Sequence, residues 1–287
     1  MSDDLNGRTW EGVPKPADFR AGPLGWTLAV LRAVPLLAVL VLGLAILLML
    51  RLGERPFCGL KRPMSPWVTV AVCRLALVIL GIRWRATGRP PMHHIGAIVA
   101  NHVSWLDIFA LNAATPLYFV SKAEVARWPG IGWLARATGT VFIRRNGRDA
   151  KVQQQLFEDR IRAGHLLAFF PEGTSTDGMR VLPFKPTLFA AFYSHGLDRV
   201  MQIQPVTLIY RAPDGRSPRF YGWWSDMTFG NHLLKVLAQA RQGSIELRFA
   251  APVDVHAFAD RKALCRAAEA QVRSGLPEAF HRLPDWL

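Results

Sequence analysis

The sequence predicts an α/β protein of one domain, whose mixed, largely parallel sheet is flanked by helices and preceded by an N-terminal membrane-inserted helical segment. From residue 95 onward, short runs rich in Val, Ile and Phe alternate with helical stretches, which is typical of a sheet covered on both faces. Most of the apolar excess of a chain with 51% hydrophobic residues lies before residue 90. We therefore divide the 287 residues into a polar N-terminal arm at 1–25, membrane-anchoring helices with a basic juxtamembrane segment at 26–90, and the α/β domain at 91–287.

Two apolar runs predict the membrane-inserted segment. Ala33 to Leu50 carries no charge over eighteen residues, which is at the lower limit for a spanning helix of about 20 residues. The second run, Trp67–Ile82, carries Arg74 in its middle. Because a lone Arg at bilayer depth costs several kcal/mol, we expect the second helix to be half-inserted or interfacial rather than a second full span.

The strongly basic charge limits the kinds of partner. A formal net charge of +14 implies an acidic partner: nucleic acid, anionic lipid headgroups or an acidic carrier protein. The chain shows no helix-turn-helix and no aromatic–basic surface pattern, which argues against nucleic acid. Seven basic residues lie between and after the apolar runs, and both lipid contact and the positive-inside rule place them on the cytoplasmic side. They are Arg51, Arg55, Lys61, Arg62, Arg83, Arg85 and Arg89.

Six apolar runs of the α/β part are expected to be strands, and five stretches between and after them are expected to be helices. The strands are Ile95–Ala100, Leu117–Val120, Thr140–Ile143, Leu166–Phe170, Gln202–Tyr210 and Ser244–Phe249. The helices are expected near 104–113, 149–163, 184–194, 228–240 and 256–275.

Cysteine usage argues against a disulfide framework and against a zinc site. Cys58, Cys73 and Cys265 are far apart in the sequence and form no CxxC pair, as paired zinc ligands would. We expect them to be apolar packing residues in a reducing compartment, and we expect neither a metal nor a cofactor.

The strongest chemical signal is Asn101-His102-Val-Ser104-Trp-Leu-Asp107, which directly follows an expected strand. Histidine is the side chain best suited to accept a proton near neutral pH, and a carboxylate can fix its tautomer. Five residues rotate by roughly 500° on a straight helix, so His102 and Asp107 meet only if His102 lies on the loop and Asp107 in the first helical turn. Ser104 as N-cap and Asp107 at a capping-box position would supply that geometry. The alternative is that Asp107 only caps the helix and His102 is an ordinary loop histidine.

Two further motifs end expected strands. Phe170-Pro171-Glu172-Gly173-Thr174 places a carboxylate and free backbone N–H groups at the carboxyl end of a strand, where ligands of α/β sheets usually bind. The strand Gly139–Ile143 delivers Arg144 and Arg145, which could hold a phosphate or carboxylate bidentately. The alternatives are a plain surface turn and a solvated strand end.

In this order, NHxxxxD, an FIxR-type strand, FPEGT and Gln204-Pro205-Val206 resemble the four blocks of the glycerolipid acyltransferase family, which includes 1-acylglycerol-3-phosphate acyltransferase. The resemblance runs from about residue 90 to 250, with Lys122 and Lys185 at positions where the family has matching residues. It implies His102 as general base and Asp107 as its orienter. It also implies acceptor binding by Glu172, Gly173, Thr174, Arg144 or Arg145, Lys122 and Lys185.

The resemblance further implies direct attack of an acceptor hydroxyl on an acyl thioester, without an acyl-enzyme. The sequence agrees, since it contains no GxSxG nucleophile elbow. The thioester donor would be acyl carrier protein or acyl-coenzyme A, and the acceptor would be a lysolipid.

One departure from the common family pattern bears on the acceptor. Many members continue EGT with Arg-Ser, where this chain has Ser175-Thr176-Asp177-Gly178. The FPEGT-[ST]-x-DG pattern resembles the subgroup that acylates lyso-ornithine lipid and related amino-acid lipids. A zwitterionic headgroup needs less positive charge than a phosphate monoester, and Asp177 could meet its ammonium group.

We therefore expect a membrane-bound lysolipid O-acyltransferase at the bacterial inner membrane, with its catalytic domain on the cytoplasmic side in contact with anionic lipids. Lyso-ornithine lipid or a related lyso-aminolipid is the expected acceptor. The alternatives are phosphatidic acid synthesis from 1-acyl-sn-glycerol-3-phosphate and a non-catalytic membrane lipid-binding protein.

Overall fold

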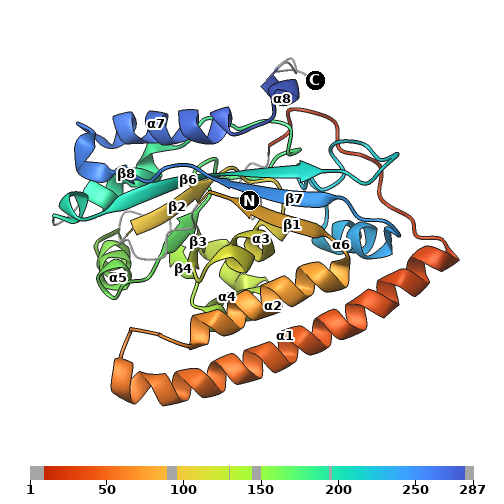
Figure 1. Ribbon diagram of the computed structural model, residues 1–287, viewed down its shortest axis with the longest axis horizontal. Coiled ribbons are helices and arrows are strands. Elements are labelled where there is room, and N and C mark those ends of the chain that lie inside the picture. Colours follow the sequence, from red (N-terminus) through yellow and green to blue (C-terminus); the bar gives the residue numbers. More distant parts are fainter. Residues whose placement is uncertain (1–9, 89–95, 129, 144–149, 194–195, 282–287) are drawn as a thin grey trace, which may run out of the picture.

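The computed structural model describes residues 10–88, 96–128, 130–143, 150–193 and 196–281. Its centre is an eight-stranded sheet with the order β1-β7-β6-β2-β5-β3-β4, and β8 pairs with β6 off this path (Figure 1). The strands are β1 (Arg83–Thr87), β2 (Gly96–Ala100), β3 (Tyr118–Lys122), β4 (Val141–Ile143), β5 (Leu167–Phe169), β6 (Gln202–Arg211), β7 (Ser244–Phe249) and β8 (Val253–Asp254).

The sheet is mixed and mostly parallel, which confirms the predicted fold class. Strands β6, β2, β5, β3 and β4 run parallel to one another, whereas β7 and β8 run antiparallel to β6. The six expected strands are all present, with ends that differ by at most two residues. Strand β1 was not predicted. It pairs with β7, so the sheet begins before residue 91, where we expected the α/β domain to start.

Side chains of the sheet alternate between two hydrophobic cores. On β2, Ile98 and Ala100 pack with the helices on one face, and Ala97 and Val99 pack on the other. The first face is covered by α1 (Pro23–Cys58), α2 (Ser65–Leu80), α3 (Leu106–Ala114) and α6 (Phe229–Ala238). The second face is covered by α5 (Ala150–Arg162), α7 (Arg261–Ser274) and the 3-10 helix η3 (Pro186–Tyr193). Figure 1 shows α7 across the sheet from α1 and α2.

The remaining elements correct the expected helices in detail. The stretch expected at 184–194 forms the 3-10 helix η3 instead of an α-helix, and the last expected helix is divided into η5 (Val255–Ala257) and α7. Several short elements were not predicted: β8, η1 (Ala123–Arg127), α4 (Ile131–Thr138), η4 (Leu197–Arg199) and the last helix, α8 (Glu278–His281), which ends the described chain.

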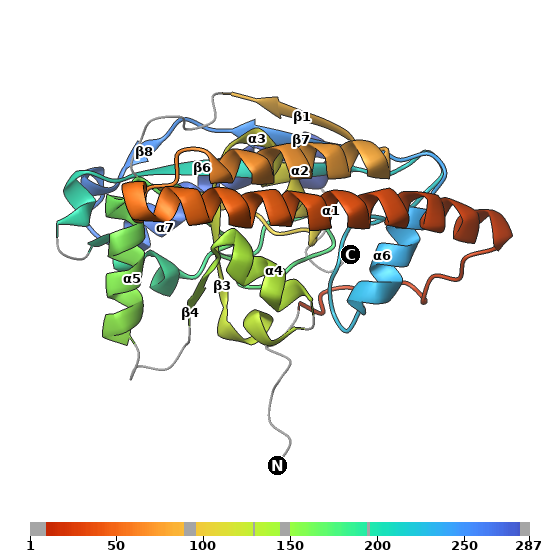
Figure 2. The same cartoon turned by 90° about the horizontal axis from the view of Figure 1, so that it is seen from below.

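Helix α1 is long and apolar enough to cross a membrane, by length and composition. Within its most apolar stretch of 18 residues, only 17% is buried inside the protein. It lies side by side with α2 across one face of the molecule (Figure 2). Both helices contact the globular part, so the apolar segment is an integral layer of the fold rather than a separate tail.

Arginines attach these helices to the domain. Arg32 of α1 donates to the carbonyls of Leu237 at 2.8 Å and Gln239 at 2.6 Å, at the carboxyl end of α6. Arg74 of α2, whose charge argued against a full span, donates through Nε to the carbonyl of Ala113 at 2.8 Å, at the end of α3. Its guanidinium is therefore directed at the protein, where a helix end carries partial negative charge.

Candidate active site

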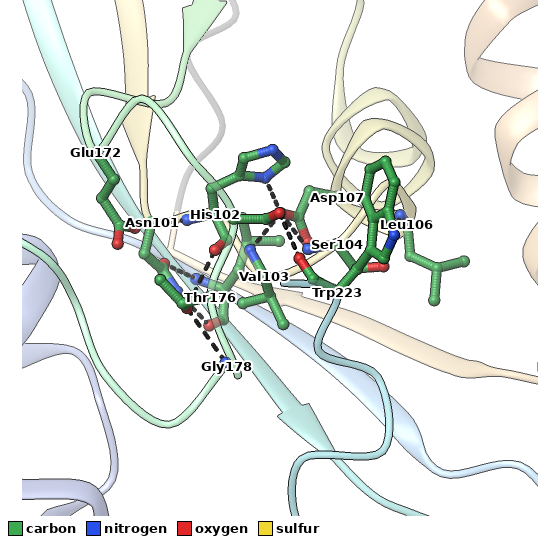
Figure 3. Close-up of polar contacts among 12 residues, drawn as sticks. Asn101, His102, Val103, Ser104, Leu106, Asp107, Glu172, Thr176, Gly178 and Trp223 are labelled. Carbon is green, nitrogen blue, oxygen red and sulfur yellow. Dashed lines mark hydrogen bonds and ion pairs between the residues drawn. The ribbon is translucent and has the colours of Figure 1, made fainter. Parts of the chain in front are cut away.

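His102 and Asp107 meet at the carboxyl end of β2. His102 lies on the loop after β2, Asp107 lies in the first turn of α3, and His102 Nδ1 is 2.7 Å from Asp107 Oδ2 (Figure 3). The same oxygen accepts the backbone N–H groups of Val103 at 2.7 Å and Ser104 at 3.1 Å. Asp107 thus orients the imidazole and ties the start of α3 at once. Ser104 is not the side-chain cap that we expected, because its Oγ accepts only a long bond from Leu106 N at 3.4 Å.

The second oxygen of Asp107 binds a residue that the sequence analysis missed. Tyr210, at the end of β6, donates its hydroxyl to Asp107 Oδ1 at 2.6 Å. Burial first, and then the charge of Asp107, raise the pKa of Tyr210 well above its ordinary value of 10, so the phenol remains a neutral donor. Asp107 is fully buried, and these donors replace the water that its carboxylate has lost.

The ring of His102 is positioned by stacking as well as by Asp107. It lies parallel to the ring of Phe170, with 4.1 Å between centroids, and 21% of its side chain is exposed. When Nδ1–H donates to the carboxylate, Nε2 carries the lone pair. That tautomer is the one a general base requires.

Glu172 supports His102 from behind. Only 2% of Glu172 is exposed, and its two oxygens accept the backbone N–H groups of His102 at 2.7 Å and Leu182 at 2.8 Å. Burial raises the pKa of Glu172 to about 8 against the effect of these two bonds. Both oxygens accept backbone N–H groups, so Glu172 holds the loop after β2 in place.

The rest of the FPEGT loop and Trp223 clamp the same backbone. Thr176 donates to the carbonyl of His102 through both its N–H at 3.0 Å and its Oγ1 at 3.2 Å (Figure 3). Trp223 donates its N–H to the carbonyl of Val103 at 3.0 Å, and its own carbonyl accepts Ser175 Oγ. The backbone of residues 102 and 103 is therefore fixed from two sides.

Of the other predicted binding residues, some lie near His102 and two lie outside the described part of the chain. Lys185 lies over the turn at Gly173, because a Cβ on Gly173 would be 2.7 Å from Lys185 Nζ, and a φ of +74° also favours glycine there. Thr174 Oγ1 accepts the backbone N–H of Trp10 at 3.3 Å. Lys122 ends β3, at the same edge of the sheet as His102. Arg144 and Arg145 lie outside the described residues.

The expectation that Asp177 meets a headgroup ammonium is wrong. Asp177 is 1% exposed, and its Oδ2 is 3.0 Å from Arg219 Nε and 3.3 Å from Arg180 Nη2. A buried carboxylate with two guanidinium partners is already neutralised. Asp177 therefore belongs to the scaffold of the loop.

Within the described ranges, no three His, Cys, Asp or Glu side chains are grouped so that they could hold a metal ion. Cys58, Cys73 and Cys265 are free thiols.

Comparison with known proteins gives three findings. Residues 89–209 match the family model "Acyltransferase". The chain is 61% identical over 267 residues to lyso-ornithine lipid O-acyltransferase of Rhodobacter capsulatus, covering 93% of this chain and 96% of that protein. It is 33% identical over 208 residues to 1-acyl-sn-glycerol-3-phosphate acyltransferase of Neisseria gonorrhoeae, covering 71% and 79%.

The fold also has a solved counterpart. The crystal structure of the 1-acyl-sn-glycerophosphate acyltransferase PlsC from Thermotoga maritima superposes with a TM-score of 0.56 at 21% identity, covering 88% of this chain and 99% of that one. At this identity the likeness concerns the fold.

The bond from Tyr210 to Asp107 makes a prediction for the pH profile. Tyr210→Phe removes a donor from a buried carboxylate, which should then hold the imidazolium proton more strongly. We expect the acid limb of kcat/KM to move to higher pH and turnover at neutral pH to fall by about tenfold, since a hydrogen bond to a charged group contributes about 1.5–3 kcal/mol.

Tyr221→Phe is the matched control. Its hydroxyl bonds to Gln242 Oε1 at 2.8 Å and to Gly243 N, and its ring lies 5.5 Å from that of Tyr210. The control should alter stability but not the pH profile. An unchanged profile in Tyr210→Phe would show that the phenol only packs beside the site.

Proposed function

The chain belongs to the acyltransferase family, and from this premise we propose that it transfers a fatty acyl chain from an acyl thioester to the hydroxyl of lyso-ornithine lipid. At the coarser level, it is a lysolipid acyltransferase of the lyso-ornithine lipid or 1-acylglycerol-3-phosphate type. The observation that carries the chemistry is the His102–Asp107 pair, with Nδ1 engaged and the ring partly exposed. The likeness to the Rhodobacter capsulatus enzyme over 96% of its length supports the acceptor.

In the proposed mechanism, His102 Nε2 accepts the proton of the acceptor hydroxyl while that oxygen attacks the thioester carbonyl. Asp107 stabilises the imidazolium that forms. The tetrahedral intermediate then breaks its C–S bond, and the imidazolium returns the proton to the departing thiolate. The oxygen ester and the free thiol are the products, so atoms and charges balance.

Direct transfer is favoured over an acyl-enzyme. A covalent intermediate needs an accessible nucleophile close to the base. Ser104 is the hydroxyl within the motif, and it is fully buried with its Oγ turned to the backbone of α3. The acceptor hydroxyl is therefore the group that His102 activates.

We further propose that α1 lies along one leaflet and does not cross the bilayer. Arg32 is bound to the end of α6, and Arg51 is bound to the carbonyls of Ala137 and Thr138 at the end of α4. These arginines are separated by about 28 Å of helix, close to the thickness of a hydrocarbon core of about 30 Å. If α1 crossed the bilayer, one of the two arginines would be carried away from the helix end that it binds. If α1 lies in the interface, both contacts are kept.

The proposed base is tested by His102→Ala. We expect a loss of at least about 10²-fold in kcat, the usual contribution of a positioned general base, in a protein that still folds. His256→Ala, which removes an exposed histidine on η5, should retain full turnover. Near-normal turnover by folded His102→Ala protein would refute the mechanism.

The acceptor is tested by a panel with the full-length chain and labelled acyl donors, both acyl carrier protein and coenzyme A thioesters. We expect the highest kcat/KM with lyso-ornithine lipid, ahead of 1-acyl-sn-glycerol-3-phosphate and glycerol-3-phosphate. A preference of tenfold or more for 1-acyl-sn-glycerol-3-phosphate, about 1.4 kcal/mol, would instead identify a phosphatidic acid synthase. Transfer to none of the acceptors would support a lipid-binding protein without activity.

Membrane attachment is tested by washing and by charge insertion. The wild-type chain should remain with membranes in high salt, because apolar insertion is not screened as ion contacts are. Replacing the exposed Leu31 and Leu42 of α1 by Asp should move most of the protein to the soluble fraction. The control Val200→Asp adds a charge at an exposed site beside the second hydrophobic core. This variant should remain in the membrane fraction. Release of the wild type by salt alone would contradict the proposal.

A further inference from the structure

Three arginines converge at one corner of the domain, two from neighbouring segments of the chain and one from a distant helix. We call this group the arginine corner: Arg51 of α1, Arg62 of the α1–α2 turn and Arg160 of α5, around Tyr118. The guanidinium carbons of Arg160 and Arg62 lie 4.6 Å and 5.6 Å from the centroid of the Tyr118 ring. Arg160 Nη2 and Arg62 Nη1 both approach Gly139, at 3.0 Å and 2.8 Å from where its Cβ would be.

The corner lies at the opposite edge of the sheet from His102. Tyr118 begins β3, and Gly139 stands just before β4. His102 and Glu172 follow the carboxyl ends of β2 and β5. Since β2, β5, β3 and β4 are parallel, the two groups of residues belong to opposite ends of these strands. The arginine corner is therefore separate from the acyl-transfer site.

The positive charge of the corner is balanced only in part, by the nearby carboxylate of Glu54. Among the described residues, no ion pair joins an acid to any of the three arginines. Glu54 Oε1 accepts the N–H groups of Met64 and Ser65, and its Oε2 is buried without a hydrogen-bond partner. One carboxylate faces three guanidinium groups, so a net positive charge remains. Burial first, and then the charge of Arg62, lower the pKa of Arg160 to about 10. Arg160 is buried and Arg51 and Arg62 are partly buried, so water screens the repulsion between their guanidinium groups only weakly.

Backbone carbonyls use only part of the donor capacity. Arg51 binds the carbonyls of Ala137 and Thr138, and Arg160 binds that of Gly139. The end of a helix supplies roughly half a negative charge, against three full positive charges. Four buried donors remain without a partner: Arg51 Nε, Arg62 Nη1, Arg160 Nε and Tyr118 Oη. Such a concentration of unpaired buried donors in a native fold indicates a bound ion or water.

We propose that the arginine corner binds a phosphate group. Guanidinium forks match phosphate oxygens bidentately, and a phosphate would bring the negative charge that the corner lacks. The turn that carries Arg62 also exposes apolar side chains, with Phe57 88% and Met64 56% exposed. A phospholipid headgroup, whose chains would lie against this turn, and free phosphate are the two sources of the group. The site serves binding, not acyl transfer.

The test uses the purified full-length chain in detergent and measures its melting temperature. The added probes are inorganic phosphate, a short-chain phosphatidylglycerol and, as the uncharged comparison, diacylglycerol of the same chain length. We expect the phosphatidylglycerol to raise the melting temperature and the diacylglycerol not to. Arg62→Gln should weaken the fitted affinity by about tenfold or more, as expected for loss of one charge-assisted contact.

Arg55→Gln is the matched control, because Arg55 is an exposed arginine in the last turn of α1 outside the corner. It should respond as the wild type does. Without any probe, Arg62→Gln should melt no lower than the wild type, since it relieves repulsion. If inorganic phosphate also raises the melting temperature, the site accepts a free anion. If only the phosphatidylglycerol raises it, the site binds a lipid headgroup. Equal responses of Arg62→Gln and the wild type, or no response of the wild type to either phosphate, would overturn the proposal.

Discussion

The architecture of the active site depends on burying the carboxylate of Asp107. An ionised carboxylate without water is costly unless hydrogen bonds replace its hydration. The structure supplies them from two places: the loop after β2 gives His102 and two backbone N–H groups, and β6 gives Tyr210. Each donor has to come to the carboxylate, so β2, α3 and β6 are fixed relative to one another. The orientation of His102 follows from this arrangement.

Asn101 strengthens the same junction. Its side chain donates to the carbonyl of Leu208 at 3.0 Å and accepts the N–H of Leu208 at 2.7 Å, which continues the pairing of β2 and β6 beyond the last residue of β2. Glu172 and Asp177 are two further buried acids with different partners, backbone N–H groups and guanidinium groups respectively. The FPEGT loop thus acts chiefly as a frame for the catalytic loop. Its two acids bind groups of the protein itself, and the bond of Glu172 holds the loop against the segment that carries His102.

Local patterns predicted what depends on local order. Alternating apolar runs located six strands, and the His102–Asp107 spacing predicted a loop-to-helix junction, because both features are contained in short segments. Tyr210 could not be found this way, since it meets Asp107 only after the chain has returned through the sheet. Strand β1 was missed for a related reason: its arginines were interpreted as lipid contacts, but Arg85 pairs with Glu246 on β7 at 2.6 Å. The ion pair of Asp177 with Arg219 could not be predicted either, because Arg219 lies in a loop far along the chain.

The charges within the apolar helices have one physical explanation. Arg32, Arg51 and Arg74 each reach a carbonyl at the carboxyl end of a helix of the globular part, α6, α4 and α3 respectively. Helix ends of this kind carry partial negative charge, and in each case the arginine stem can lie along apolar surface while its head is satisfied. These arginines therefore dock the apolar helices onto the domain instead of opposing their insertion. With α1 in the membrane surface as proposed, these three contacts set the height of His102 above the lipid, because only two residues separate the end of α2 from the start of β1.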